Sequence, residues 1–398
     1  MKYVVIVPDG MADRPLAELG NKTPLEVART KNMDYLAKNG RTGMVKTIPD
    51  RFEPGSDIGN LALLGYRPEK YFSGRAPLEA ANHDIELGPS EVAFRCNLIT
   101  VVDGKMIDYS AGHIPTEQAD QLIKALNEQM DLAGGRFVTG KSYRHLLILS
   151  TRDPKSYLKM KSVPAHDILG QLVSRHLPKG PASQPLLEIM EKARTILENH
   201  QVNQVRLDLK ENPANSIWLW GQGIRPQFPG FEEKFGVKGA IISAVDLVNG
   251  IGKLIGLKVI DVPGITGYYD TDYRAKAEYA IKALKSRDYV YIHVEAPDEA
   301  GHNGDIKEKI RAIENIDREI VGRIIKHFER SQEVRILVVP DHPTPIALRR
   351  HSREPVGFVM YGKGILPDGS IVYHEKAAKL HGLQFKSGEA LIQALMKH

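Results

Sequence analysis

The chain has 398 residues, of which 42% are apolar and 26% charged, so it can form two or three domains with a core of ordinary size. The net charge of +5 is small for this length. Because lysine and arginine alternate with acidic residues, the charge does not indicate a nucleic-acid-binding protein. The single cysteine, Cys96, excludes an internal disulfide framework and favours a reducing compartment, and its apolar neighbours predict a buried, inert thiol.

The first ten residues, MKYVVIVPDG, are too short and too soon interrupted to form a signal peptide. No apolar run approaches the roughly 20 residues of a membrane span. The sequence therefore predicts a cytoplasmic protein without a membrane partner.

In chain order, the apolar run 3–7 predicts a buried strand that ends just before Asp9. Thr23 and Pro24 then open a predicted helix that stops at Gly40, and residues 41–48 predict the next strand. Ser56 follows a Pro-Gly pair and precedes a helical run, where unpaired backbone N–H groups favour negative charge. Two interpretations of Ser56 remain open here, an ordinary helix cap or a nucleophile that carries phosphate.

From about residue 91 to 235 the alternation of strand and helix is less regular. Residues 116–130 predict an amphipathic helix, and Arg144 and His145 head a predicted strand. For these two residues, and for His113 and His166, surface or interdomain packing is the alternative to a binding role. Trp218 and Trp220 are predicted to lie in the core.

From Val237 onward, strands and helices alternate again in the sequence. This pattern predicts an α/β fold with a mostly parallel sheet flanked by helices, which the N-terminal strand joins. The predicted domains are a discontinuous core, 1–90 and 237–398, and an inserted smaller α/β domain, 91–236.

Acidic and imidazole side chains follow three of the predicted strands. Their residues are Asp9 after the first strand, Asp298 and His302 after residues 289–297, and Asp341 and His342 after residues 336–339, with His351 nine positions further on. Taken alone, the stretch 336–351 fits either a turn with surface histidines or a site for divalent transition metal ions. Ligands meet at the carboxyl ends of parallel strands, so three such ends favour a two-metal site.

Several longer motifs then carry a family resemblance. They are EPGSDIGNLALLGY, SGRAPLEAA, AFRCNL, DYSAGHI, SYRHLL, PANSIWLWGQG, KGAIISAVDLVNGIG, PGITGYYDTDY, HVEAPDEAGHNGD and PDHPTPIALRRHS. Together with the early PDG they cover nearly the whole chain. In type and order they resemble the archaeal-type 2,3-bisphosphoglycerate-independent phosphoglycerate mutases of the alkaline phosphatase superfamily.

The resemblance implies a role for each matching residue. One ion would be held by Asp9, Ser56, Asp341 and His342, and the other by Asp298, His302 and His351. Ser56 would be the nucleophile that takes and returns the phosphoryl group of phosphoglycerate. The implied ions are Mn²⁺, or Mg²⁺, Zn²⁺ or Co²⁺ in its place, with no need for 2,3-bisphosphoglycerate.

The resemblance also implies that the inserted domain closes over a small phosphorylated acid. His113, Arg144 and His145 are its candidate substrate contacts. The alternatives are a homoserine kinase-like phosphotransferase of the same family, a metal-dependent phosphatase or phosphodiesterase, and a non-catalytic binding module on a decayed enzyme fold. A kinase here would lack the phosphate-binding GxxxxGK[ST] loop, and the decayed fold is disfavoured because all seven ligand positions carry suitable residues.

Overall fold

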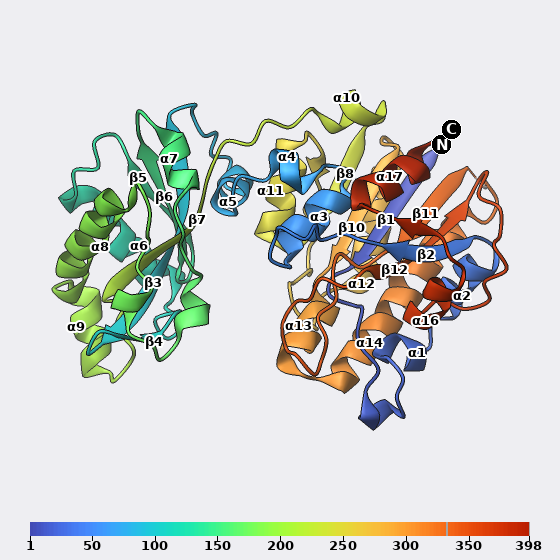
Figure 1. Ribbon diagram of the computed structural model, residues 1–398, viewed down its shortest axis with the longest axis horizontal. Coiled ribbons are helices and arrows are strands. Elements are labelled where there is room, and N and C mark those ends of the chain that lie inside the picture. The colour runs from blue at the N-terminus through green and yellow to red at the C-terminus, as the bar shows by residue number, and fades with distance from the viewer. Residues whose placement is uncertain (332, 398) are drawn as a thin grey trace. The chain divides into compact units, whose positions relative to one another are not determined.

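The computed structural model describes residues 1–331 and 333–397. By its internal contacts the chain forms two compact units (Figure 1). The first combines Met1–Phe72 with the described residues of Phe228–His398, and the second is Ser73–Gln227. Each unit has its own sheet and its own core.

The first unit is built on an eight-stranded sheet in the order β13-β2-β12-β11-β1-β10-β8-β9. Its strands are β1 (Lys2–Pro8), β2 (Arg41–Val45), β8 (Gly239–Ile242), β9 (Lys258–Val259), β10 (Tyr289–Val294), β11 (Val334–Val338), β12 (Val356–Gly362) and β13 (Gln384–Phe385). Only β12 runs antiparallel to its neighbours. The prediction of an α/β fold with a mostly parallel sheet is confirmed.

Helices flank this sheet. They are α1 (Pro24–Val27), α2 (Lys31–Lys38), α3 (Ser56–Leu63), α4 (Pro68–Tyr71), α10 (Phe231–Phe235), α11 (Asp246–Leu254), α12 (Tyr273–Ala283), α13 (Ala296–Asn303), α14 (Ile306–Asn315), α15 (Gly322–Phe328), α16 (Glu375–Leu380) and α17 (Gly388–Met396), with a 3-10 turn at Ala17–Leu19. On one face, α2, α12, α14 and α15 bury a single apolar cluster with β1, β10 and β11. Helices α3, α11 and α17 pack together (Figure 1).

Alternation along β10 separates the two faces of the sheet. Val290, Ile292 and Val294 belong to the apolar cluster under α12 and α14. Tyr291 and His293 point to the other face, where the Tyr291 hydroxyl donates to Asn60 Oδ1 of α3 at 2.7 Å. The face that carries α3 therefore presents polar side chains at the end of a central strand.

The predicted helix from Pro24 to Gly40 is divided into α1 and α2. Thr23 and Glu26 form a capping box that stabilises one short turn, and Ala28 is extended. Asp317, from far along the chain, accepts hydrogen bonds from the backbone N–H groups of Asn32 and Met33. This distant carboxylate supplies a new helix start, which the local sequence does not encode.

Two further elements differ from expectation. Asp298 and His302 were predicted on a strand-end turn, but they lie four residues apart on α13, which has Pro297 in its first turn and ends at Gly304 with φ of 70°. The helical stretch that follows, residues 306–328, is not one regular α-helix, because a π-helical segment, Ile316–Val321, lies between α14 and α15. The helical spacing brings Asp298 and His302 onto one face of α13.

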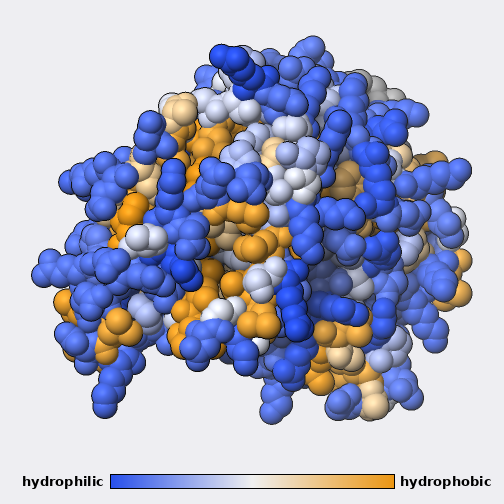
Figure 2. Space-filling view, turned by 60° about the vertical axis from the view of Figure 1, so that its left-hand side comes forward, coloured by the Kyte–Doolittle hydropathy of each residue, from blue (hydrophilic) through white to orange (hydrophobic). Residues whose placement is uncertain are grey.

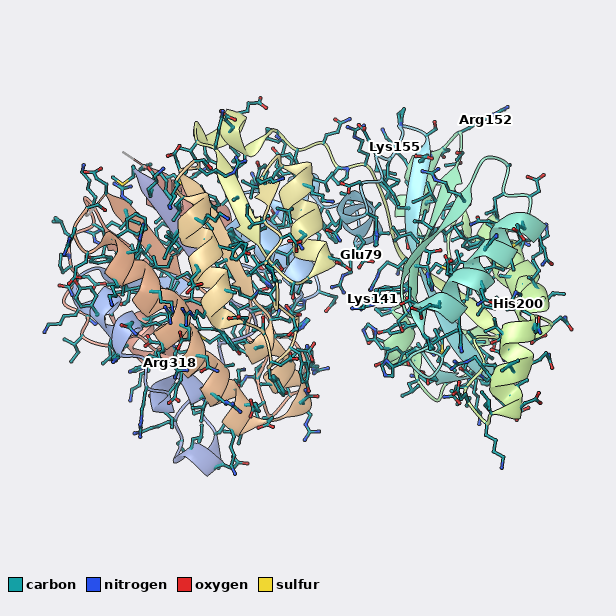
Figure 3. All side chains as sticks on the ribbon, turned by 180° about the vertical axis from the view of Figure 1, so that it is seen from behind. Glu79, Lys141, Arg152, Lys155, His200 and Arg318 are labelled. Carbon is teal, nitrogen blue, oxygen red and sulfur yellow. The ribbon has the colours of Figure 1, made fainter. Side chains whose placement is uncertain are left out.

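The second unit carries a five-stranded antiparallel sheet, in which β3 pairs with β4, β6 and β7, and β6 pairs with β5. Its strands are β3 (Glu91–Val102), β4 (Lys105–Asp108), β5 (Arg136–Lys141), β6 (Arg144–Ser150) and β7 (Ser216–Ile224). Its helices are α5 (Ala76–Asn82), α6 (Thr116–Gln129), α7 (Pro154–Leu158), α8 (Ser183–Glu198) and α9 (Gln201–Asp208), with 3-10 turns at Ala165–Ile168 and Val173–Arg175. His200 caps α9 by accepting the Val202 N–H (Figure 3).

The core of the second unit contains the predicted apolar residues. Trp218 is 1% exposed and Trp220 is 4% exposed, which confirms the core prediction for both. Cys96 is fully buried, and burial raises the pKa of its thiol. At the N-terminal end of the second unit, α5 packs against β3 and β7. Residues 73–90 therefore belong with the sheet that follows them in the chain.

Hydrophilic side chains cover much of the face in Figure 2, with apolar patches between them. Among the described residues, no helix combines the length and apolar character that crossing a membrane requires.

Candidate metal centre

Ser56 opens α3 at the centre of the candidate site. The preceding Gly55 is extended, and a Cβ there would lie 2.7 Å from Oδ1 of Asp57, so the approach to Ser56 is closely packed. Ser56 is 7% exposed, and its Oγ lies 3.2 Å from Nε2 of His342. The helix dipole of α3 places partial positive charge beside this hydroxyl.

Asp9, Asp341 and His342 gather beside Ser56 because β1 and β11 are parallel neighbours. His342 Nε2 lies 3.4 Å from Asp9 Oδ1 and 3.5 Å from Asp341 Oδ2. Asp341 also accepts hydrogen bonds from Asn60 Nδ2 at 2.7 Å and from the Gly10 N–H at 3.2 Å. All three side chains are fully buried, which fixes their orientation.

Asp298, His302 and His351 form a second group. His302 Nε2 lies 3.2 Å from Asp298 Oδ2 and 2.9 Å from His351 Nε2, and His351 Nε2 lies 3.5 Å from Asp298 Oδ1. The ring centroids of His351 and His342 are 4.2 Å apart, so the second group adjoins the first. The structure thus brings together all seven residues that the sequence proposed as metal ligands.

Burial and mutual repulsion control the charge of this centre. Burial, and then the charge of Asp341, raises the pKa of Asp9 well above its usual range. Burial also raises the pKa of Asp298, but hydrogen bonds from His302 and His351 outweigh it and leave the pKa well below its ordinary value. Burial lowers the pKa of His342 to about 3, so its imidazole is neutral and can offer a lone pair.

The sequence interpretation missed His293. Its Nε2 lies 2.8 Å from Asp9 Oδ2, and its Nδ1 lies 3.2 Å from the Ser243 hydroxyl. Burial lowers its pKa to about 4, so it is neutral. The available signal was the alternation of Tyr289, Tyr291 and His293 with aliphatic residues along β10.

The donor atoms fit a divalent cation. Two sets have their donor atoms within 4.8 Å of one another, namely Asp298 with His342 and His351, and Asp9 with His293 and Asp341. Asp9 Oδ1 is buried and has no hydrogen-bond partner among the described residues. Imidazole nitrogens and carboxylate oxygens suit Mn²⁺, Zn²⁺ or Co²⁺, and an orphaned buried oxygen is what an ion would satisfy.

His113, Arg144 and His145 belong to the second unit. Both His113 and Arg144 are exposed and lie near the ring of Tyr143, with the His113 ring centroid at 6.0 Å and the Arg144 guanidinium at 5.6 Å from its centroid. Arg144 pairs across the β5–β6 turn with Lys141, and Lys141 is labelled in Figure 3. His145 is 3% exposed, and its Nδ1 accepts the Gly140 N–H at 3.1 Å.

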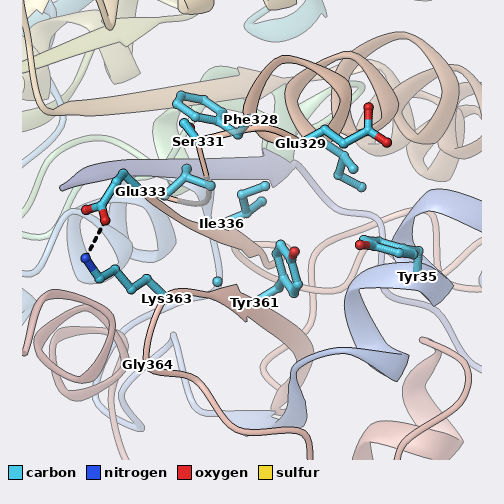
Figure 4. Close-up of a pocket in the computed structure, with 12 residues that line it drawn as sticks. Tyr35, Phe328, Glu329, Ser331, Glu333, Ile336, Tyr361, Lys363 and Gly364 are labelled. Carbon is cyan, nitrogen blue, oxygen red and sulfur yellow. Dashed lines mark hydrogen bonds and ion pairs between the residues drawn. The ribbon is translucent and has the colours of Figure 1, made fainter.

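A pocket of about 620 Å³ lies elsewhere in the first unit, where β11 begins (Figure 4). Its wall combines Tyr35, Phe328 and Tyr361 with an ion pair between Lys363 and Glu333. This pocket is at the amino end of β11, whereas Asp341 and His342 follow its carboxyl end. It contributes nothing to the candidate metal centre.

A buried serine at a helix start lies against a neutral imidazole that is itself beside two buried carboxylates, at the carboxyl ends of parallel strands. These donor groups place the chain among α/β proteins whose strand ends could hold a divalent metal ion. A family model described as 2,3-bisphosphoglycerate-independent phosphoglycerate mutase matches residues 37–203. A mutase of that name from Methanothrix thermoacetophila is 50% identical over 398 residues, covering 100% of both chains. A probable one from Geobacter sulfurreducens is 46% identical over 401 residues, again covering 100% of both.

Two solved structures are similar to this chain over nearly its whole length. A Pyrococcus horikoshii protein superposes with a TM-score of 0.84 at 30% identity, covering 99% of this chain and 97% of that one. The cofactor-independent phosphoglycerate mutase of Thermoplasma acidophilum gives 0.69 at 28% identity, covering 100% and 99%. The chain therefore belongs to the 2,3-bisphosphoglycerate-independent phosphoglycerate mutases, a family of isomerases.

Proposed function

We propose that the chain interconverts 3-phosphoglycerate and 2-phosphoglycerate through a phosphoserine at Ser56, without 2,3-bisphosphoglycerate. The observation that carries this proposal is the 3.2 Å approach of Ser56 Oγ to the neutral His342 ring, within a cage of buried carboxylates. Membership of the mutase family supplies the substrate.

One ion would be held by Asp9, Ser56, Asp341 and His342, and the other by Asp298, His302 and His351. When bound, such ions lower the pKa of a serine hydroxyl and stabilise the charge of the transferred phosphoryl group. Mn²⁺ is the proposed physiological ion, in keeping with the family resemblance, and each group contains the carboxylate oxygens that suit it. His293 holds Asp9 in place through the contact of Nε2 with Oδ2.

In the first half-reaction, Ser56 Oγ loses its proton and attacks phosphorus, the bond from phosphorus to the substrate oxygen breaks, and that oxygen takes up a proton. In the second, the other hydroxyl of the glycerate attacks phosphoserine, and the Ser56 hydroxyl forms again. The start of α3 favours the negative charge of the phosphoryl group throughout. Neither half-reaction uses water. A mutase must keep water away from the phosphoserine, because hydrolysis would release the phosphate.

We assign that exclusion to the second unit, Ser73–Gln227, as a closing domain. Arg144, exposed on the ring of Tyr143, would bind phosphate or carboxylate through two parallel N–H donors, with His113 beside the same ring. His145 is buried, so its proposed role is to hold Gly140, and with it the turn before Arg144.

A two-stage assay tests the proposal. Metal-stripped protein is incubated with 3-phosphoglycerate alone or with Mn²⁺ and then removed by filtration. Enolase added to the filtrate reports any 2-phosphoglycerate as phosphoenolpyruvate, so the Mg²⁺ that enolase needs never meets the mutase. We expect product only after Mn²⁺ addition, and the absence of product with Mn²⁺, Co²⁺, Zn²⁺ and Mg²⁺ alike would reject the mutase assignment.

A further inference from the structure

A second cavity of about 530 Å³ lies in the first unit beyond the carboxyl end of β2. Its walls come from the segment after β2, the end of α3, the start of α4 and the turn before α17, which are neighbours in Figure 1. Its wall includes four basic residues and a threonine, namely Lys46, Arg51, Arg67, Lys386 and Thr47. None of the candidate metal ligands lines this cavity.

The backbone explains why basic residues gather there. Strands β2 and β13 are parallel, with Val45 opposite Phe385, and the Lys46 N–H donates to the Phe385 carbonyl at 3.1 Å. Lys46 and Lys386 therefore follow neighbouring strand ends. Helix α17 begins directly afterwards, so its positive end faces the same space, and carboxyl ends of parallel strands are where α/β proteins bind ligands.

Part of the charge in this cavity is already balanced. Lys46 lies 2.6 Å from Asp50, Arg67 lies 3.9 Å from Glu69, and Glu389 is paired with Lys234 at 2.9 Å. Arg51 has only the ring of Phe52 beneath its guanidinium, and neither it nor Lys386 reaches a carboxylate among the described residues. Two exposed cations thus remain for an anion.

Thr47 gives an independent sign of a missing partner. It lines the cavity and is only 2% exposed, yet its hydroxyl Oγ1 has no hydrogen-bond partner among the described residues. A buried hydroxyl without a partner is destabilising, so such groups are rare in folded proteins. Because Oγ1 itself is buried, rotation of the Thr47 side chain toward the cavity would let a ligand oxygen satisfy it.

We propose that this cavity, lined by Thr47, Arg51 and Lys386, binds a small phosphate-bearing anion. Phosphate oxygens suit guanidinium, ammonium and hydroxyl donors together. The volume lies in the range of small-molecule sites, and it exceeds what a single phosphate ion needs. The site is separate from Ser56, which begins α3, because the cavity takes Ala62 from the last turn of that helix and Tyr66 from the segment after it.

Equilibrium dialysis of radiolabelled ADP against the full, metal-loaded chain tests this site. We expect saturable binding that falls roughly tenfold or more in the Arg51→Ala/Lys386→Ala variant, as loss of charged hydrogen-bond donors implies. Lys282→Ala and Lys307→Ala remove exposed lysines elsewhere in the first unit and should leave binding unchanged. If the metal ligands also bind ADP, that fraction of the bound ADP would remain in every cavity variant.

Thr47→Val separates a ligand role from a structural one. Loss of the hydroxyl should weaken ADP binding several-fold while leaving the thermal midpoint of the free protein unchanged or higher, since an unsatisfied group is removed. Displacement of ADP by inorganic phosphate would identify phosphate as the group recognised, and displacement by adenosine would identify the nucleoside. Binding that survives both the double variant and Thr47→Val, or no saturable binding of ADP or phosphate, would overturn the proposal.

Discussion

Ser56 Oγ lies 3.2 Å from His342 Nε2, although 286 positions separate the two residues in the chain. The start of α3 and the end of β11 hold them together, and both side chains are buried. A hydroxyl placed against a neutral imidazole and several carboxylates has little structural use, since Ser56 does not act as the cap of α3. This contact is the basis for assigning chemistry to Ser56.

Replacing Ser56 by alanine should abolish phosphoglycerate turnover, because the variant has no atom to carry the phosphoryl group. The fold should persist, since the change removes one oxygen at a helix start. The two-stage enolase assay measures turnover, and circular dichroism with thermal unfolding measures the fold. Ser286→Ala, at an exposed position, is the matched control, and near-normal turnover by Ser56→Ala would exclude Ser56 as the nucleophile.

Replacing His351 by alanine should weaken one metal site selectively. His351 Nε2 lies 3.5 Å from Asp298 Oδ1 and 2.9 Å from His302 Nε2, so its loss removes one imidazole from that group. Elemental analysis after dialysis should show loss of about one of the two proposed equivalents of metal. His327→Ala removes an exposed histidine and should retain both, and unchanged metal content in His351→Ala would argue against a ligand role.

Replacing Lys309 by methionine should destabilise the first unit strongly. Lys309 Nζ lies 2.8 Å from Asp13 Oδ2 and donates to the Thr344 carbonyl at 2.8 Å, and both charged side chains are fully buried. Removing one partner leaves a buried charge uncompensated, which costs about 3–5 kcal/mol. Urea unfolding should show this loss, whereas Lys307→Met, two positions away and exposed, should change little.

If the Lys309→Met variant instead unfolds at the wild-type urea concentration, the pair contributes nothing measurable. The double variant with Asp13→Asn provides a further check. Because it also removes the uncompensated carboxylate, it should recover part of the lost free energy of unfolding.

His145 should make the stability of the second unit fall as the solution becomes acidic. Burial lowers its pKa to about 4, against an ordinary value of 6.5. Below pH 6.5 the His145 imidazole binds a proton in the unfolded chain, whereas in the folded chain it does so only near pH 4. The free energy of unfolding should therefore decrease across this window, by up to about 1.4 kcal/mol per pH unit from this residue.

His145→Asn retains an acceptor for the Gly140 N–H but cannot titrate, so its unfolding free energy should vary less with pH between these limits. His381→Asn, at an exposed position, should keep the wild-type profile. Urea unfolding at several pH values measures both, and identical slopes for wild type and His145→Asn would contradict the assignment.

Much of the candidate site can be predicted from the sequence, because the end of a buried strand is marked by the end of an apolar run. Asp9 and Asp341 each follow an apolar run, and the parallel pairing of β1 and β11 brings them together without further information. His293 could not be recognised in the same way. Tyr289, Tyr291 and His293 alternate with aliphatic residues, but every residue of β10 is buried, so this alternation does not correspond to one exposed and one buried face.

Other differences arise from long-range contacts. The break between α1 and α2 depends on Asp317, nearly three hundred residues away, which captures the N–H groups of Asn32 and Met33. The helix that carries Asp298 and His302 has local start and stop signals in Pro297 and Gly304, but it is only eight residues long and follows β10 almost directly. The contribution of His145 likewise depends on a burial that its exposed neighbour Arg144 does not indicate.

The strand order also affects how the chain folds while it is being synthesised. β1 lies between β10 and β11, and β2 between β12 and β13, so neither N-terminal strand has a partner before residue 289. At ribosomal rates this means a delay on the order of ten seconds or more. The unit Ser73–Gln227 is continuous and can complete its sheet during that delay. Asp9 and Ser56 are thus made long before the residues that become their native neighbours.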